Sequence, residues 1–423
     1  MNRLVLIGNG FDLAHGLKTS YADFVNWYWD KRMIGFNNDY SDVSEDLLCR
    51  FRILNDKREE RETWSTLAFA HNYFRSFPAL GKEYVGKDVI ASIIEDTDYF
   101  ETKFSPLFER IIKGLESKTW AGIEQDYYDL LKEYAFRDST VNPNEPPIKA
   151  LNQQLRYLQQ LLVEYLTEVD KQGITKNQQI WDKIYAPIKT DDISVAGKKH
   201  WREHIDYWMN EGRKDLPLRK EHFGIVPDGY LDDVNEYKEN PKPLSYLGDY
   251  PLLLRLPGRV MLLDFNYTNT CGIYAKHHAA EHVQIHGNLD DPKSIIFGYG
   301  DELDDKFKEL KAHKNNACLS HVKSIRYLEA PNYRQMLSFI ESEPFQVLIM
   351  GHSCGNSDRT LLNTIFEHPN CVSIKPYYYV TDKEKGTDNY IELVQHISRN
   401  FNDMKLMRDR VVNKTQCEPL VKE

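Results

Sequence analysis

A short apolar run opens the chain and ends in a glycine-rich turn. Residues 3–7 read Arg-Leu-Val-Leu-Ile and are followed by Gly8, Asn9 and Gly10. Both faces of this run are apolar, which is typical of a buried strand in a parallel sheet. A helical pattern follows over about residues 12–30. A strand, a glycine turn and a helix in this order predict the start of an α/β domain of the nucleotide-binding kind.

Similar runs return in the last third of the chain, and each ends in small or polar residues. They cover residues 260–263, 282–285, 294–297, 345–350 and 377–380, and the residues that follow them are Asp264-Phe265-Asn266-Tyr267-Thr268, His286-Gly287, Gly298, Gly351-His352-Ser353 and Thr381-Asp382. The carboxyl ends of the strands in an open parallel sheet border the ligand crevice. We therefore expect these polar ends to converge on one site, although the first two strands lie about 250 residues apart.

The middle of the chain has a different pattern. Residues 39–170 are charged, aromatic and helix-periodic, and one apolar stripe is formed by Leu151, Leu155, Leu158, Leu162, Tyr165 and Val169. This spacing predicts one long helix that packs in a bundle. Residues 187–250 read as irregular connections with short helices. We therefore predict an α/β fold with a mostly parallel Rossmann-like sheet and a large all-helical insertion. Residues 1–36 and 255–423 would form the discontinuous nucleotide-binding domain, and residues 37–254 the mainly helical insertion.

Composition narrows the class of protein. The chain has 423 residues, 41% of them hydrophobic, and a formal net charge of −10. This content excludes a disordered chain, and no apolar run approaches the roughly 18 residues that span a bilayer. The acidic balance argues against broad capture of nucleic acid. Six cysteines without any C-x-x-C pair favour reduced thiols over a disulfide framework or a cysteine-type zinc site. We expect a cytoplasmic protein that has no membrane segment and no bound metal.

The first turn is a candidate phosphate-binding loop. Glycines at positions 8 and 10 would let backbone N–H groups approach a phosphate at the start of a helix. The third glycine of a G-x-G-x-x-G motif is missing, because position 13 is leucine. A tight structural turn is an equal alternative. Asp12 would either cap the helix or hold a ribose hydroxyl.

Two other strand ends carry candidate catalytic groups. Asn266 offers one acceptor and two donors, which suits the binding of a ribose or a water, or alternatively closes an Asx-turn. His286 has the right chemistry for a general base at neutral pH, although a lone histidine is more often a packing residue. The functional interpretation is favoured if His286 and Asn266 share one crevice.

The end of the strand over residues 345–350 also carries residues that could bind a phosphate. Ser353 could donate to a phosphate, and Asp358 stands at the start of a helix predicted over residues 358–366. Asp358 could serve only as that helix's N-cap.

These motifs resemble a known family. Residues 4–17 (Leu-Val-Leu-Ile-Gly-Asn-Gly-Phe-Asp-Leu-Ala-His-Gly-Leu), with Thr19, Tyr21 and Phe24, look very like the AbiH family of bacterial phage abortive-infection proteins. The later Phe265-Asn266-Tyr267-Thr268, His286-Gly287 and Gly351-His352-Ser353 segments, together with Asp358, match that family's later motifs, and Trp120 with Glu124 looks like a further family position. The resemblance spans the whole chain and implies an anti-phage effector.

More remotely, the order of the motifs is similar to the sirtuin-like NAD-consuming fold. That resemblance implies that Gly8, Gly10 and Ser353 hold the phosphates or ribose of NAD, that Asn266 orients ribose or water, and that His286 is the base. The residues expected to be catalytic are His286 and Asn266, and those expected to bind NAD are Gly8, Asn9, Gly10, Phe11, Asp12, His15, Tyr267, Thr268, Gly287, Gly351, His352, Ser353 and Asp358. The chain departs from that fold at Asn9, at Thr268 and in lacking a four-cysteine zinc module. The last difference argues against protein deacetylation.

The chemistry needs few polar groups. Nicotinamide is already a cationic leaving group in NAD, so that its release needs no general acid. The site must hold the ribose, favour an oxocarbenium-like transition state and deliver a water. We therefore predict NAD glycohydrolase activity. Such an enzyme must be held inactive until needed, so we expect a homo-oligomer or a blocking loop and a phage-derived trigger.

Other interpretations remain open. His200-Trp201-Arg202-Glu203-His204 fits the H-x-x-E-H zinc-peptidase pattern. His278, His282 and His286 recur every four residues, but a strand over residues 282–285 would separate them. Residues 198–222 combine basic and aromatic residues and could contact nucleic acid, although acids nearly cancel the charge. A nucleotide sensor without turnover and, at lower rank, a nuclease complete the alternatives.

Overall fold

The computed structural model describes residues 1–38, 43–54, 100–113, 120–136, 147–199, 255–275 and 280–422, with a few isolated positions between them. The chain divides into two compact units. The first contains Met1–Leu17, Asp170–Asp305 and Val322–Glu423, and the second contains Lys18–Val169 and Lys306–His321. The unit boundaries differ from the predicted domain boundaries near residues 36 and 255, and the domain assignment stays a prediction.

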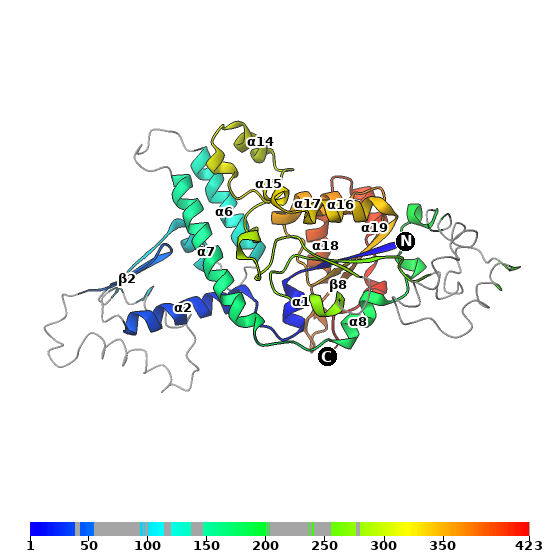
Figure 1. Ribbon diagram of the computed structural model, residues 1–423, viewed down its shortest axis with the longest axis horizontal. Coiled ribbons are helices and arrows are strands. Elements are labelled where there is room, and N and C mark those ends of the chain that lie inside the picture. The colour runs from blue at the N-terminus through cyan, green and yellow to red at the C-terminus, as the bar shows by residue number, and fades with distance from the viewer. Residues whose placement is uncertain are drawn as a thin grey trace. The chain divides into compact units, whose positions relative to one another are not determined.

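The first unit is built on a five-stranded parallel sheet in the order β6-β5-β1-β7-β8. Figure 1 shows the blue first strand beside strands from the late, red part of the chain. Its strands are β1 (Asn2–Ile7), β5 (Val260–Asp264), β6 (Glu281–Gln284), β7 (Phe345–Met350) and β8 (Cys371–Tyr377). In β1, Val5 pairs with Leu262 on one side and with Leu348 on the other. The predicted mixed α/β class with a mostly parallel sheet is confirmed.

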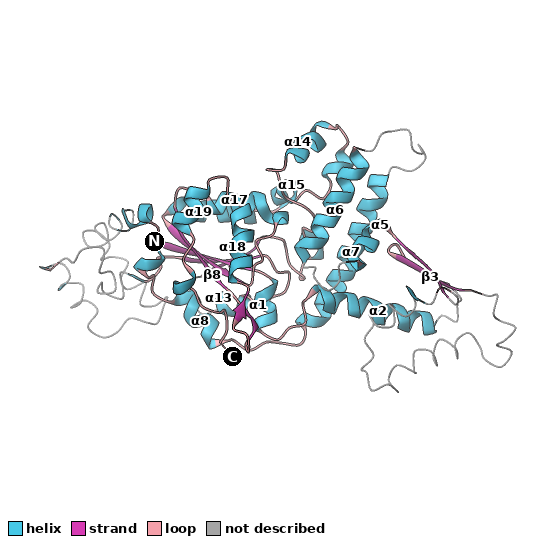
Figure 2. Ribbon diagram, turned by 180° about the vertical axis from the view of Figure 1, so that it is seen from behind, coloured by secondary structure: helices cyan, strands magenta, loops and turns pink. Residues whose placement is uncertain are grey.

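Helices cover both faces of this sheet (Figure 2). Leu4 and Leu6 of β1 point into one apolar layer with α16, α17, α18 and α19, whereas Val5 and Ile7 point into the other layer with α1, α8 and α13. The bounds are α1 (Asn9–Ala14), α8 (Gln178–Tyr185), α13 (Gly272–Ala275), α15 (Lys323–Arg326), α16 (Asn332–Ser342), α17 (Arg359–Phe366), α18 (Tyr390–Arg399) and α19 (Met404–Arg410). Because alternate residues of a strand face opposite sides, an apolar run without alternation is buried on both.

The order of the strands reverses beside β1. The chain runs from β1 outward through β5 and β6, and then crosses back to β7 and β8 on the other side. In open α/β sheets, ligands bind at the carboxyl ends of the strands near such a reversal. The residues that follow β1, β5, β6 and β7 therefore meet at the edge where chemistry is expected.

The second unit combines helices with a small antiparallel sheet. Its helices are α2 (Tyr21–Asn38), α5 (Pro106–Ile112), α6 (Trp120–Ala135), α7 (Pro147–Asp170) and α14 (Asp305–Ala312), and its strands are β2 (Val43–Glu45), β3 (Cys49–Ile53) and β4 (Phe100–Phe104). The predicted stripe is confirmed, because all six of its side chains are buried along α7. The prediction of an all-helical insertion is wrong. In β3 the buried Cys49 and Phe51 alternate with Arg50 and Arg52, and this charged alternation was interpreted as helical.

Three other predicted elements differ from the structure. The helix over residues 12–30 is two helices, α1 and α2, separated at Gly16, where φ is +80°. Residues 295–297 are buried but form no strand, because Pro292–Ser294 is a 3-10 helix. The strand predicted over residues 377–380 is displaced: β8 ends at Tyr377, and Val380–Asp382 begins the small hairpin of β9 (Val380–Asp382) and β10 (Thr387–Asp388).

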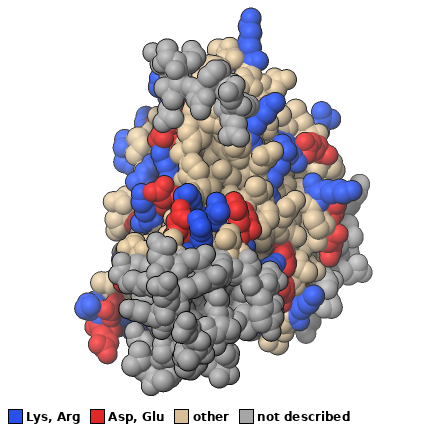
Figure 3. All heavy atoms as spheres, turned by 90° about the vertical axis from the view of Figure 1, so that its left-hand side faces the viewer, with Lys and Arg blue, Asp and Glu red and all other residues tan. Residues whose placement is uncertain are grey.

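Three further observations concern the cysteines, the described helices and one face of the surface. All six cysteines are free. Among the described helices, none combines the length and the apolar composition needed to cross a lipid bilayer. On the face drawn in Figure 3, the Lys and Arg side chains of the described residues lie interspersed with Asp and Glu.

Candidate functional site

The carboxylate of Asp358 is surrounded by three basic side chains at the carboxyl edge of the first unit's sheet. Its Oδ1 lies 2.8 Å from Lys323 Nζ and 3.3 Å from His286 Nε2, and its Oδ2 lies 3.7 Å from His352 Nε2. A buried charge is tolerated only when it is paired and hydrogen-bonded. Burial opposes ionisation of Asp358, but the charge of Lys323 and the interaction with His286 outweigh it and hold its pKa well below the usual range. The carboxylate is therefore ionised at neutral pH.

Asp358 does not act as a side-chain cap, which was the structural alternative. It occupies the N-cap position of α17, but its carboxylate makes no cap hydrogen bond. It accepts instead from Lys323, the first residue of α15. The sequence motif thus identified a residue of the cluster and not merely a helix start.

His286 follows β6 and points at this carboxylate. Its Nε2 also lies 3.1 Å from the hydroxyl of Tyr327, and its ring packs edge-on against Phe265, with the centroids 5.3 Å apart. Among the described residues, its Nδ1 has no hydrogen-bond partner. The carboxylate and the hydroxyl therefore favour the tautomer with the proton on Nε2, which leaves Nδ1 as the acceptor. A histidine oriented in this way is suited to act as a general base.

Gly287 makes the turn that directs the chain away after His286. Its φ is +82°, and a Cβ there would fall on the carbonyl group of Ser294. Only glycine fits both conditions, so that this position is structural.

His352 lies on the other side of Phe265. The two ring centroids are 4.1 Å apart, and His352 Nδ1 accepts a hydrogen bond from the backbone N–H of Cys354 at 3.0 Å. Burial lowers the pKa of His352 to about 4, although Asp358 acts in the opposite direction. This imidazole is neutral at physiological pH and supplies no positive charge to a ligand phosphate.

The glycine turn after β1 packs directly on the turn after β7. A Cβ at Gly8 would come within 2.6 Å of His352 Cα, and one at Gly10 within 2.8 Å of Gly351 Cα. The N–H groups of Gly8, Gly10 and Phe11 all donate to backbone carbonyls, those of Met350, Gly351 and Gly8 respectively. The close approach of the two turns accounts for the glycines. In this conformation residues 8–10 therefore form a tight structural turn and not an open phosphate-binding loop.

Asn266 ties the end of β5 to this turn. Its Nδ2 donates to the carbonyl of Gly8 at 3.1 Å, while its own backbone N–H donates to Asp264 Oδ1 at 3.0 Å. The Asx-type closure after β5 is thus made by Asp264 and not by Asn266. The side chain of Asn266 is half-buried and follows directly after Phe265, which contacts both His286 and His352.

Asp12 forms a second buried carboxylate, one turn into α1. Its Oδ2 accepts a hydrogen bond from Thr268 Oγ1 at 2.6 Å, whereas its Oδ1 has no partner among the described residues. Burial and the charge of Asp264 raise the pKa of Asp12 to about 7, although Thr268 acts in the opposite direction. Since Gly8 is the N-cap residue of α1, the predicted capping role of Asp12 is wrong.

The remaining predicted residues make other contacts. His15 bonds the Phe11 carbonyl at 2.7 Å and the Tyr274 hydroxyl at 2.6 Å. Tyr267 donates its hydroxyl to the carbonyl of Ile296 at 3.1 Å. The carbonyl of Ser353 accepts from His396 Nδ1 at 2.9 Å, and Asn9 is half-buried at the start of α1. The motif residues thus form neighbouring groups around Asp358, around the glycine turns and around Asp12.

Trp120, Thr19, Tyr21 and Phe24 belong to the core of the second unit. Trp120 Nε1 donates to the carbonyl of Thr19 at 3.0 Å, and its ring centroid lies 5.6 Å from that of Tyr21 and 5.4 Å from that of Phe24. These motif positions are explained by packing.

Sequence reasoning missed Lys323 and Tyr327. They are four residues apart, which places them on one side of a helical turn, but no local motif distinguishes them from other Lys and Tyr residues. His200 and His204 of the zinc-peptidase pattern, His278, and most of the basic–aromatic segment 198–222 lie outside the described residues.

A comparison with protein families matches residues 4–379 to the family described as "Bacteriophage abortive infection AbiH". No curated protein and no solved structure matches the chain.

Proposed function

Because the chain belongs to the AbiH family of bacteriophage abortive-infection proteins, we propose that it is an anti-phage effector that binds NAD and hydrolyses the bond between nicotinamide and ribose. The family supplies the biological setting. The NAD chemistry is supported by the groups at the carboxyl edge of the parallel sheet, whose Rossmann-like or sirtuin-like character is part of the proposal.

The observation that carries the proposal is the pairing of His286 with Asp358. Nδ1 of His286 would take a proton from a water that attacks C1′ of the ribose. The C1′–N bond breaks, the bonding electrons stay with nicotinamide, and ADP-ribose retains the new hydroxyl. Asp358 then stabilises the imidazolium, in the manner of a carboxylate that orients a catalytic base.

Asn266 has the second role in this proposal. Its Nδ2 is held by the Gly8 carbonyl, so the carboxamide oxygen is fixed relative to the turn after β1. A fixed acceptor costs no reorganisation when it orients a ribose hydroxyl or the attacking water.

The glycine turns have to rearrange for the pyrophosphate to bind where the motif places it. The Gly10 N–H donates to the Gly351 carbonyl at 2.9 Å, so it would be available to a phosphate only after this hydrogen bond opens. Such a closed turn would hold a toxic activity back until a trigger arrives. We infer a phage-derived trigger and a homo-oligomer as the means of release.

The direct test is mass spectrometry of the purified full chain incubated with NAD, alone and with lysate from phage-infected cells. We expect equal amounts of nicotinamide and ADP-ribose, lost in His286→Ala and in Asn266→Ala. His313→Ala is the matched control, because His313 is exposed in the second unit. Absence of nicotinamide under both conditions, or unchanged turnover in His286→Ala, would overturn the proposal. NAD that binds tightly but is never cleaved would instead support a nucleotide sensor.

A further inference from the structure

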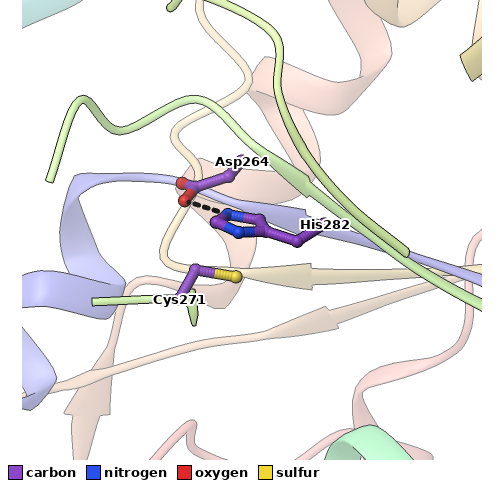
Figure 4. A group of neighbouring side chains, drawn as sticks. All are labelled: Asp264, Cys271 and His282. Atoms are coloured by element: carbon purple, nitrogen blue, oxygen red, sulfur yellow. Dashed lines mark hydrogen bonds and ion pairs between the residues drawn. The ribbon is translucent and has the colours of Figure 1, made fainter. Parts of the chain in front are cut away.

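Three side chains of different chemistry converge beside the catalytic groups of the first unit. Asp264 ends β5, Cys271 precedes α13, and His282 lies in β6. One donor atom from each lies within 4.8 Å of the other two, and Figure 4 shows Cys271 next to the Asp264 and His282 side chains, which are joined by a dashed line. Asp264 Oδ2 and His282 Nε2 are 3.0 Å apart.

This donor set suits zinc. Cysteine sulfur, histidine nitrogen and a carboxylate oxygen are the ligands that Zn²⁺ takes in tetrahedral sites, at about 2.3 Å for sulfur and about 2.0–2.2 Å for nitrogen and oxygen. Donors arranged in this way are separated by roughly 3.3–3.8 Å. The three donor atoms therefore need to approach one another by at most about 1.5 Å. A thiolate and a carboxylate with a neutral imidazole bring two negative charges, which a divalent cation neutralises.

Asp12 provides an independent observation. Its side chain is 1% exposed, and its Oδ1 has no hydrogen-bond partner among the described residues. It lies close enough to Asp264 and to Cys271 to act electrostatically on both. The ionised form of Asp12 is disfavoured in this place, as its raised pKa of about 7 shows, and a nearby cation would favour it.

We propose that Asp264, Cys271 and His282 bind a Zn²⁺ ion as its three protein ligands. A water would complete the tetrahedron, and the charge of Asp12 would favour the cation from outside the ligand set. The ion would fasten the ends of β5 and β6 to the segment before α13, and it would displace the proton of the Cys271 thiol on binding. No bound metal was expected from the sequence. The zinc proposal does not depend on NAD hydrolysis, and each can be tested without the other.

The experiment measures metal directly. Full-length protein is expressed with zinc in the medium, freed of any affinity tag, desalted, and analysed for bound metal by mass spectrometry. We expect about one zinc per chain in the wild type, a loss of at least tenfold in Cys271→Ser, and full retention in Cys371→Ser. Cys371 is the matched control because both cysteines are buried to the same extent, at 1% exposed.

A second measurement does not depend on any variant folding. Chelator-treated wild-type protein is titrated with Co²⁺ alone, which reports its ligands through its absorption spectrum. We expect saturation near one equivalent, with the intense visible bands of a tetrahedral site and a thiolate charge-transfer band in the near ultraviolet. No stoichiometric zinc together with no such bands, or bands that persist unchanged in a folded Cys271→Ser protein, would overturn the proposal.

Discussion

Lys323 Nζ lies 2.8 Å from Asp358 Oδ1, and both residues are buried. Lys323 begins α15 and Asp358 stands at the start of α17, so the ion pair joins two short helices at the edge of the sheet. The carboxylate of Asp358 is too buried to be stabilised by water, and the ion pair with Lys323 keeps it ionised instead. The orientation of His286 therefore depends on a lysine that no local sequence motif distinguishes.

Removing this lysine should leave an uncompensated buried charge. We expect Lys323→Met to destabilise the protein by about 3–5 kcal/mol, measured by urea denaturation. The double variant Lys323→Met/Asp358→Asn should lose less than the sum of the two single variants, because the unpaired charge is removed with its partner. Lys385→Met is the control, since Lys385 pairs with Asp382 on the surface and should cost at most about 1 kcal/mol. Additive losses in the double variant would contradict the coupling.

His352 should make the protein sensitive to mild acid. Its pKa is lowered from 6.5 to about 4, so the unfolded chain binds more protons than the folded one between these values. The contribution of neutral His352 to the free energy of unfolding is therefore fully present above about pH 6.5, and it is lost as the pH falls toward 4. The full shift corresponds to about 3 kcal/mol of folding free energy.

The pH effect is isolated by comparing the wild type with His352→Asn, whose amide oxygen can still accept from the Cys354 N–H. Asp12, whose pKa is raised, acts in the opposite direction over the same range, and Asp358, His286 and Lys323 all act on His352. Between pH 7 and pH 4 the denaturation midpoint of the wild type should fall relative to that of His352→Asn. A constant difference between the two midpoints would show that His352 does not titrate in this way.

The contact between the two glycine turns should tolerate no side chain. In Gly351→Ala the new Cβ would fall on the backbone nitrogen of Phe11 at a φ of +75°, so we expect a loss of about 3 kcal/mol or more. Gly386→Ala has a similar φ of +64° with open space around it, and should cost only about 1 kcal/mol. Thermal denaturation of the two variants tests the difference, and equal losses would show that the turns do not need to touch.

Tyr327 is a positioning residue in the proposed reaction. Tyr327→Phe removes the hydroxyl that holds His286 Nε2, and one hydrogen bond of about 0.5–1.5 kcal/mol corresponds to roughly a two- to tenfold fall in kcat. KM for NAD should stay constant, because the hydroxyl has no proposed contact with the dinucleotide. Tyr333→Phe is the control, since its ring stacks on Tyr327 but does not contact His286. A change in KM alone would contradict the assignment.

The parallel sheet was predictable where its strands contain an uninterrupted apolar run of four residues. β1 and β7 read as buried runs in the sequence, and the polar residues after them do lie together. β8 was misplaced because it contains Ser373, Lys375 and Pro376, and Lys375 is buried only because it pairs with Asp192 at 2.9 Å. A polar residue that is neutralised by a distant partner cannot be recognised locally.

The residues of the candidate site likewise fall into those that the sequence predicts and those that it does not. His286, His352 and Asp358 follow strand ends or start a helix, so topology alone places them at one edge. Lys323 and Tyr327 reach that edge from a segment without a strand, and their positions depend on the tertiary fold. The glycines after β1 and β7 were predicted to approach a phosphate, whereas in the structure they approach each other. The glycines made it predictable that another group would approach the backbone closely. They did not show whether that group would be a phosphate or the other glycine turn.

The position of β1 has a consequence for synthesis. The strand that lies at the centre of the sheet is made long before its two neighbours, because β5 and β7 begin only at residues 260 and 345. At typical translation speeds β5 follows after roughly 13–50 s and β7 after roughly 17–70 s. Until β5 is made the apolar strand has neither neighbour, and residues of the second unit can fold before the sheet that flanks them in the sequence is complete. The apolar side chains of β1 therefore need shielding until residue 264 has been made, and one edge of the strand stays open until residue 350.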